Sequence, residues 1–244
     1  MAWFVAPLFF LIALVYSSVG FGGGSLYLAV LAFTLTSQDA MRIIALICNS
    51  LATTSGSWNF LRESRMPVGR FIPLLACSIP ACILTSTIAI SDVVFFGVLA
   101  VALIIAGILM LIRFQQIGNT KNQHSWHFYS LTAAIGALAG LTGIGGGVYL
   151  APYLTLKNWG TAKEISAVSA IFILTNSLAG LITRLVLCDD MNLEAHGILW
   201  IATIVGGFIG SYFSSKSWPH SRIRQVTGLI LIIAGTRILL AQLL

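Results

Sequence analysis

Eight long apolar segments account for most of this chain of 244 residues. They lie near residues 3–35, 41–60, 68–90, 93–113, 127–156, 165–187, 196–214 and 224–244. A helix that crosses the hydrocarbon core of a bilayer needs about 20 apolar residues. Charged residues make up only 8% of the chain, against about 25% in soluble domains. The sequence therefore predicts an all-α polytopic membrane protein and excludes an ordinary soluble enzyme, a disordered protein and a secreted disulfide scaffold.

The net charge of +6 does not indicate nucleic-acid binding. The basic residues stand singly or in small groups between apolar segments, where they set membrane topology. No pair of the four cysteines has the spacing of a zinc or redox site, so we expect buried free thiols and no cofactor or metal. The sequence contains no H-E-x-x-H, G-x-S-x-G or P-loop motif, and no intramembrane pair of carboxylates, so an enzyme is not expected.

Three short sequences occur twice, in the same order and 123 to 128 residues apart. GFGGG at residues 20–24 returns as GIGGG at 143–147, NSLA at 49–52 returns at 176–179, and LIIAG at 103–107 returns at 231–235. Matches in one order at nearly one separation indicate a duplication. We predict two homologous transmembrane repeats, residues 1–118 and 119–244, that form one integrated membrane domain.

The first apolar segment of each half is too long for one crossing and too short for two. Residues 3–35 would form a helix about 50 Å long, while the hydrocarbon core is about 30 Å thick. Three consecutive glycines lie inside this segment and favour a break, because glycine is a poor helix former. We predict a helix, a glycine turn and a shorter helix that either continues across the membrane or folds back as a re-entrant hairpin.

The distribution of Lys and Arg favours the re-entrant hairpins. If every segment crosses, the 13 basic residues divide seven against six. If the two glycine segments fold back, ten lie on one side and only Arg42, Arg184 and Arg237 lie on the other, as the positive-inside rule requires. The sequence thus predicts three spanning helices and one broken, re-entrant hairpin in each half, and halves of inverted topology. Both termini would face the outside, and residues 115–126 the cytoplasm.

The two glycine turns are the main candidates for a substrate site. Non-helical backbone at membrane depth is tolerated where it is buried in protein or lines a wet cavity. Open backbone amides and the positive end of the following short helix attract an anion. Close packing of helices through small residues is the alternative reading of the same glycines. The predicted binding residues at the turns are Gly22, Gly23, Gly24, Ser25, Thr142, Gly145, Gly146 and Gly147, with Tyr27 and Tyr149 as secondary candidates.

Asn49 and Asn176 lie near the middle of corresponding segments. Polar groups at that depth are costly in hydrocarbon and usually face the bundle interior. Each asparagine begins a stripe with a spacing of four residues, which places its members on one helix face. The stripes are Asn49, Thr53 and Ser57 in the first half, and Asn176, Gly180 and Arg184 in the second. We predict that the asparagine amides donate to a bound anion, with hydrogen bonding between the repeats as the alternative.

Three further residues, Cys48, Thr53 and Arg184, are secondary candidates for the anion path. Thr53 and Arg184 belong to the two stripes, and Cys48 lies next to Asn49. Arg42, Arg184 and Arg237 lie on the predicted outer side, where they would draw anions into a vestibule. The alternative is that each of these arginines snorkels to the lipid headgroups.

The repeated Gly-x-Gly-Gly-Gly motif resembles the sulfite exporter TauE/SafE family of permeases. YLAP at residues 149–152, after the second motif, and GGFIG at residues 206–210 also resemble that family, and the resemblance covers essentially the whole chain. One departure is Pro152, whose place in the first half is taken by Ala29 or Val30.

The resemblance implies a permease for sulfite, sulfonates or related small organosulfur oxyanions in a bacterial inner membrane. Its partners would be the small anionic substrate and the lipid bilayer, without nucleic acid. An anion channel and a non-transporting membrane scaffold subunit are the alternatives. The sequence leaves four properties undetermined: the exact substrate, the direction of transport, the coupling ion and the oligomeric state. A second copy of the chain, in a homo-oligomer, is therefore an open alternative among its partners.

Overall fold

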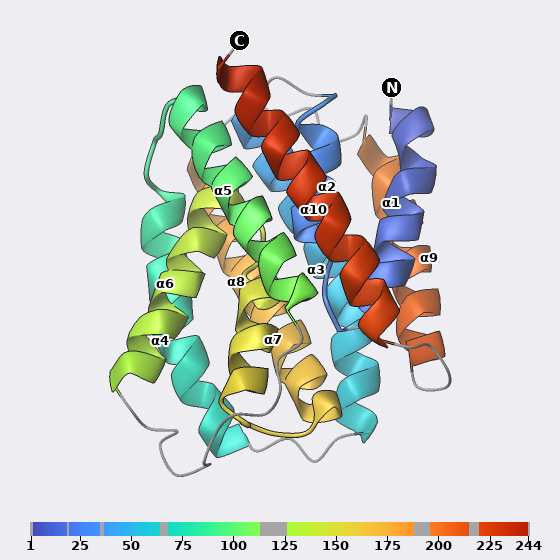
Figure 1. Ribbon diagram of the computed structural model, residues 1–244, viewed down its shortest axis with the longest axis vertical. Helices are drawn as coiled ribbons and strands as arrows, with labels where there is room; N and C mark the ends of the chain where they lie inside the picture. Colours follow the sequence, from blue (N-terminus) through green and yellow to red (C-terminus); the bar gives the residue numbers. More distant parts are fainter. Residues whose placement is uncertain are drawn as a thin grey trace.

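The computed structural model describes residues 2–18, 20–34, 37–63, 68–112, 126–187, 196–214 and 220–243, and these form ten α-helices without any strand (Figure 1). The helices are α1 (Ala2–Ser17), α2 (Gly24–Leu31), α3 (Gln38–Glu63), α4 (Val68–Ser86), α5 (Asp92–Leu111), α6 (Trp126–Thr142), α7 (Gly147–Leu156), α8 (Ala162–Leu187), α9 (Gly197–Ser214) and α10 (His220–Leu243). The predicted all-helical fold is confirmed.

Several helices have the length and composition of membrane spans. Within the described segments, three stretches are long and apolar enough to cross a bilayer: Asp92–Leu111, Glu164–Leu187 and Gln225–Gln242. Shorter apolar helices cover Trp3–Ser17, Phe71–Ser86, Gly147–Leu156 and Gly197–Tyr212. Large apolar side chains are exposed on the outside of many helices, which suits contact with lipid. This composition and arrangement are those of a polytopic membrane protein.

Both predicted helix breaks are present. α1 ends at Ser17 before α2 begins at Gly24, and α6 ends at Thr142 before α7 begins at Gly147. The physical reason lies in the backbone, because five glycines of the two motifs have positive φ angles that residues with a side chain rarely adopt. These glycines are Gly20, Gly23, Gly143, Gly145 and Gly146. We call residues 20–24 the first turn and residues 143–147 the second turn.

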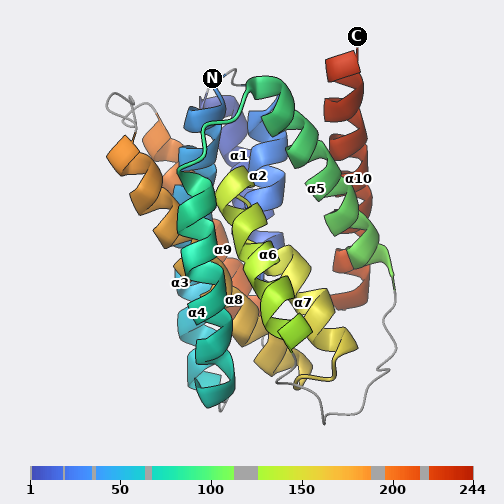
Figure 2. The same cartoon turned by 90° about the vertical axis from the view of Figure 1, so that its left-hand side faces the viewer.

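The two turns are approached from opposite ends of the molecule. The N- and C-termini lie at the same end, the upper end in Figure 1. α1 descends from the upper end without reaching the lower end, and α2 returns toward the upper end. α6 rises from the lower end, and α7 returns toward it, as Figure 2 also shows. The long helices α3 and α8 cover most of the distance between the two ends, whereas α5 and α10 stop short of the lower end.

The helices pack in pairs that join the two halves of the chain. The most extensive contacts are between α1 and α9, α4 and α6, α5 and α10, and α3 and α8. Glycines allow the close approach in three of these pairs. Gly206 of α9 lies against the Phe10 carbonyl, Gly136 of α6 against the Ser78 carbonyl, and Gly235 of α10 against the Ala100 carbonyl. The remaining pair, α3 and α8, carries both asparagine stripes.

Candidate functional site

The side chain of Asn49 joins the two turns. Asn49 lies on α3 and is fully buried. Its Oδ1 accepts a hydrogen bond of 3.1 Å from the Gly24 N–H, at the start of α2. Its Nδ2 donates to the Ile144 carbonyl of the second turn at 3.2 Å and to the Ser177 Oγ of α8 at 2.8 Å. One amide therefore connects the first turn, the second turn and α8.

The absence of side chains on three glycines allows this arrangement. A Cβ atom added to Gly22 would collide with Asn49 Oδ1, and one added to Gly145 would collide with Asn49 Nδ2. A Cβ atom at Gly24 would lie 2.6 Å from the Ile144 carbonyl oxygen. Only glycine fits at these positions, so close packing and the polar contact with Asn49 require the same residues.

Backbone amides and helix termini converge on the same place. α2 and α7 both begin at the turns, so the positive ends of their dipoles face the contact with Asn49. Across the described part of the chain, no hydrogen bond reaches the amides of Gly22, Gly145 or Gly147. Gly23 and Gly146 precede the two helices in left-handed conformations. The arrangement offers partial positive charge without a formal cation.

Asn176 is placed differently from Asn49, although it occupies the corresponding position in the second half. It is fully buried on α8, and its Nδ2 donates to the Ser78 Oγ of α4 at 3.1 Å and to the Phe172 carbonyl of its own helix at 2.9 Å. Its Oδ1 has no hydrogen-bond partner among the residues that the structure describes. Asn176 therefore bonds to neither turn.

Most of the predicted hydroxyl donors are engaged locally. Thr142 Oγ1 donates to the Leu138 carbonyl at 2.6 Å and accepts the Ile144 N–H at 3.3 Å. Thr53 Oγ1 donates to the Asn49 carbonyl of its own helix at 2.7 Å. These two hydroxyls stabilise the backbone around the turns, whereas the Asn49 side chain reaches across them.

The remaining predicted residues surround the turns at different distances. Ser25 Oγ shares a hydrogen bond of 3.3 Å with the hydroxyl of Tyr16. The Tyr27 ring stacks on Phe9 with 4.7 Å between centroids. The Tyr149 hydroxyl donates to the Ala102 carbonyl of α5 at 2.9 Å. Cys48 is a buried free thiol next to Asn49.

The other cysteines match the expectation of free thiols where the structure describes them. Cys82 is buried and Cys77 is partly buried, and both are free. Cys188 lies outside the described residues. The described part of the chain holds no cluster of three His, Cys, Asp or Glu residues that could bind a metal ion.

A cluster of charges lies on α3 and α8 toward the upper end. Asp39 Oδ1 accepts a hydrogen bond of 2.7 Å from Arg184 Nη1, which joins α3 to α8, and lies 3.8 Å from Arg42 Nη1. The Arg42 guanidinium is 4.2 Å from the ring centre of Phe95 and donates to Gln38 at 2.9 Å. The second turn contacts this cluster, because a Cβ at Gly143 would lie 3.4 Å from Arg42 Cα.

Two of the three upper arginines do not snorkel. Arg42 is 1% exposed and Arg184 is 6% exposed, because each guanidinium finds polar partners inside the protein. Arg237 is exposed, with its guanidinium 6.0 Å from the Phe33 ring centre, as snorkelling would require. Sequence reasoning missed the partner Asp39, although its position three residues before Arg42 on one helix is a signal for an ion pair.

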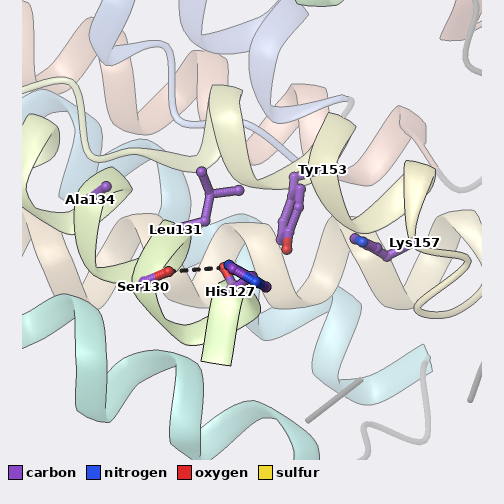
Figure 3. Close-up of a pocket in the computed structure, with 6 residues that line it drawn as sticks. All are labelled: His127, Ser130, Leu131, Ala134, Tyr153 and Lys157. Atoms are coloured by element: carbon purple, nitrogen blue, oxygen red, sulfur yellow. Dashed lines mark hydrogen bonds between the residues drawn. The ribbon is translucent and has the colours of Figure 1, made fainter. Parts of the chain in front are cut away.

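A pocket of about 490 Å³ lies between α6 and α7 toward the lower end (Figure 3). Its lining residues are His127, Ser130, Leu131, Ala134, Tyr153 and Lys157. In Figure 3 the Tyr153 hydroxyl points toward the imidazole of His127, and Ser130 Oγ donates to the His127 carbonyl at 3.2 Å. Lys157 adds a cation at the end of α7. Sequence reasoning did not single out this group, because its members come from two helices, α6 and α7, that the second turn brings side by side.

The fold and its comparisons with known proteins define a membrane transporter. The family model of the sulfite exporter TauE/SafE matches residues 5–238, and the chain belongs to this family. It is 32% identical over 242 residues to the probable membrane transporter protein y4hK of Sinorhizobium fredii (strain NBRC 101917 / NGR234), an alignment that covers 96% of this chain and 97% of that protein. No solved structure matches the chain significantly.

Proposed function

We propose that this protein is a permease that binds a small oxyanion between its two glycine turns and moves it across the membrane. The observation that carries the proposal is the meeting of both turns at Asn49. The amides of Gly22, Gly145 and Gly147 and the N-terminal ends of α2 and α7 would hold the anion. The Asn49 side chain, whose amide group donates to Ile144 and Ser177, would hold the turns in place around it. Preorganised N–H donors in a water-poor interior favour an anion without requiring a charged side chain.

The two halves act as inverted repeats in this proposal. One hairpin starts from the upper end and the other from the lower end. The helix contacts support a two-fold relation, because α1 packs on α9 as α6 packs on α4, while α5 pairs with α10 and α3 with α8. Inverted repeats around a central site are common in secondary transporters, where one repeat rocks against the other to expose the site alternately.

The lower end is the cytoplasmic one in this proposal. Within the described part of the chain, six basic residues lie at helix ends there, against three toward the upper end. The six are Arg62, Arg70, Lys157, Lys163, Arg222 and Arg224. The positive-inside rule then supports periplasmic termini, and membership of the sulfite exporter TauE/SafE family supports the inner membrane of a bacterium. An inside-negative membrane potential favours anion exit by about 2.3 kcal/mol per charge per 100 mV, which supports export without a coupling ion.

The substrate class in this proposal is a sulfur oxyanion such as sulfite or a sulfonate. Membership of the sulfite exporter TauE/SafE family supports this class. The pocket between α6 and α7 supports access from the lower end, because Lys157 and the hydroxyls of Ser130 and Tyr153 attract oxyanions.

Flux from liposomes tests the proposed function. Purified protein is reconstituted and loaded in turn with sulfite, a sulfonate and chloride, and efflux is followed over time. The proposal predicts saturable efflux of the sulfur oxyanions at low turnover. Efflux that rises linearly with concentration at high rate would indicate an anion channel. Absence of flux for every sulfur oxyanion would support a scaffold subunit or another solute.

A thermal-shift screen of small oxyanions provides a measurement of binding that does not depend on reconstitution. A ligand that binds only the folded protein raises its apparent melting temperature. Gly197→Ala is a suitable control variant, since no atom of the described residues lies within 4 Å of its added Cβ.

A further inference from the structure

Asn49 and Asn176 occupy corresponding positions in two repeats but make different contacts. Asn49 bonds to both turns, whereas Asn176 is turned toward Ser78 on α4 and leaves its Oδ1 without a partner in the described structure. A buried amide oxygen without a partner is unfavourable. It is therefore a feature to be explained, and sequence alone cannot explain it, because both asparagines lie in the same NSLA motif.

We infer that Asn176 is the counterpart of Asn49 in a second state of the protein, in which Asn176 holds both turns and Asn49 releases them. The inference rests on the proposed transport by inverted repeats, because it assigns one asparagine to each of the two alternating states. Asn49 and Asn176 are then positioning residues that take turns in joining the glycine turns.

The repeats specify the contacts of this second state. The counterparts of Gly24, Ile144 and Ser177 are Gly147, Phe21 and Ser50. Asn176 Oδ1 would accept the Gly147 N–H, and its Nδ2 would donate to the Phe21 carbonyl and the Ser50 Oγ. Ser50 Oγ now donates to the Leu46 carbonyl at 2.8 Å, so its lone pairs are available to such a donor.

The present state is the one with a closed upper end. The hydrogen bond between Arg184 and Asp39 joins α3 and α8 there, and the second turn packs beside Arg42. When the hydrogen bond between Asn49 and Ile144 breaks, the second turn loses this bond to α3. The second state is therefore the one in which the upper end of the interface between α3 and α8 opens.

Among the residues that the structure describes, the lower end has no equivalent ion pair. Ser57 corresponds to Arg184, and Ser169 corresponds to Arg42. Both serine side chains are buried, and neither hydroxyl has a hydrogen-bond partner among the described residues. In the second state the lower end is the closed one, without an ion pair like that of Arg184 and Asp39 among the described residues. Closure of the lower end would therefore depend on Asn176 more strongly than closure of the upper end depends on Asn49 in the present state.

Thiol labelling at Leu46 tests the inference without any transport measurement. Leu46 is 2% exposed on α3, and its side chain lies 3.6 Å from the position of a Cβ on Gly180 of α8. Leu46→Cys is introduced into a chain whose four native cysteines are replaced by alanine, and its reaction rate with N-ethylmaleimide is measured in native membranes. Leu103→Cys, fully buried on α5, is the control for general loosening.

The two asparagine variants are expected to act in opposite directions. Asn49→Ala removes contacts of the present state and should raise the labelling rate at Leu46→Cys by about tenfold, the effect of one to two net hydrogen bonds. Asn176→Ala removes contacts of the second state and should lower that rate severalfold. The labelling rate at Leu103→Cys should stay unchanged in both variants.

A change in the same direction in both variants, or no change in either, would overturn the inference. If Asn49→Ala fails to fold, Ser177→Ala removes only one of its hydrogen bonds and should raise labelling by a smaller factor. Opposite shifts in labelling without sulfur-oxyanion flux in liposomes would support the two states and contradict the proposed substrate instead.

Discussion

Replacement of Gly145 by alanine tests whether the contact between Asn49 and the second turn shapes the site. Gly145 has a φ of +82°, a left-handed conformation that costs an alanine about 1 to 2 kcal/mol. The added Cβ would also collide with Asn49 Nδ2 and lie 2.8 Å from Ser177 Oγ. Asn49 would then lose its bonds to Ile144 and Ser177, at a further cost of about 1 to 3 kcal/mol.

Gly143→Ala is the matched control for backbone strain. Gly143 has a φ of +81°, so alanine carries the same conformational cost there. Its added Cβ would lie no closer than 3.4 Å to Arg42, which does not displace a neighbour by more than a few tenths of an ångström. The difference between the two variants therefore isolates the contact with Asn49. About 1.4 kcal/mol of that difference corresponds to a tenfold change in the dissociation constant of a bound anion.

Both variants can be compared by calorimetric titration with sulfite in detergent, after their folding is verified by thermal unfolding. We expect the Kd of Gly145→Ala to be at least tenfold higher than the Kd of Gly143→Ala. Equal weakening in both variants would refute the role of the Asn49 contact and leave backbone strain as the cause. Unchanged binding in both would refute the glycine turns as the site.

Three other expectations concern residues outside the turns. Arg184→Gln removes the bond to Asp39 across α3 and α8 and should lower the free energy of unfolding by about 1 to 2 kcal/mol; a melting temperature equal to that of the native protein would contradict this. Lys157→Gln should raise the KM for sulfite efflux severalfold with little change in kcat, since Lys157 lines the lower pocket rather than the turns; an unchanged KM would remove that pocket from the path. Cys48 should react with a maleimide only after denaturation because its side chain is fully buried, and peptide mass spectrometry that finds it modified in the native protein would show that water reaches this part of the core.

Local chemistry made the helix breaks predictable. Three adjacent glycines disfavour a helix wherever they occur, and the apolar segments around them have lengths that fit neither one crossing nor two. The positions of Asn49 and Asn176 in the bundle interior were predictable for a similar reason, since an amide at that depth avoids lipid.

The partners of these residues could not be predicted, because they depend on how the halves pack. Asn49 bonds to Ile144 and Ser177, which lie in the other half of the chain. Asn176, in an identical local sequence, bonds to Ser78 instead. A single sequence contains no signal for this difference, since the repeat itself predicts equal environments.

The burial of Arg42 and Arg184 could not be predicted for the same reason, because it also depends on how the two halves pack. Both lie near the ends of apolar segments, where a long side chain can reach the headgroups, so sequence position favoured snorkelling. Tertiary structure brings Asp39 of α3 beside Arg184 of α8, and this pairing makes burial of the guanidinium acceptable.

The most direct test of the account is a crystal of this protein soaked with selenite, a heavier analogue of sulfite, and measured at the selenium absorption edge. The account predicts an anomalous peak beside the amides of Gly22, Gly145 and Gly147, where the selenite oxygens bonded to that selenium would accept their hydrogen bonds. A peak only in the pocket beside Lys157, or helices that run unbroken through both glycine triplets, would contradict it.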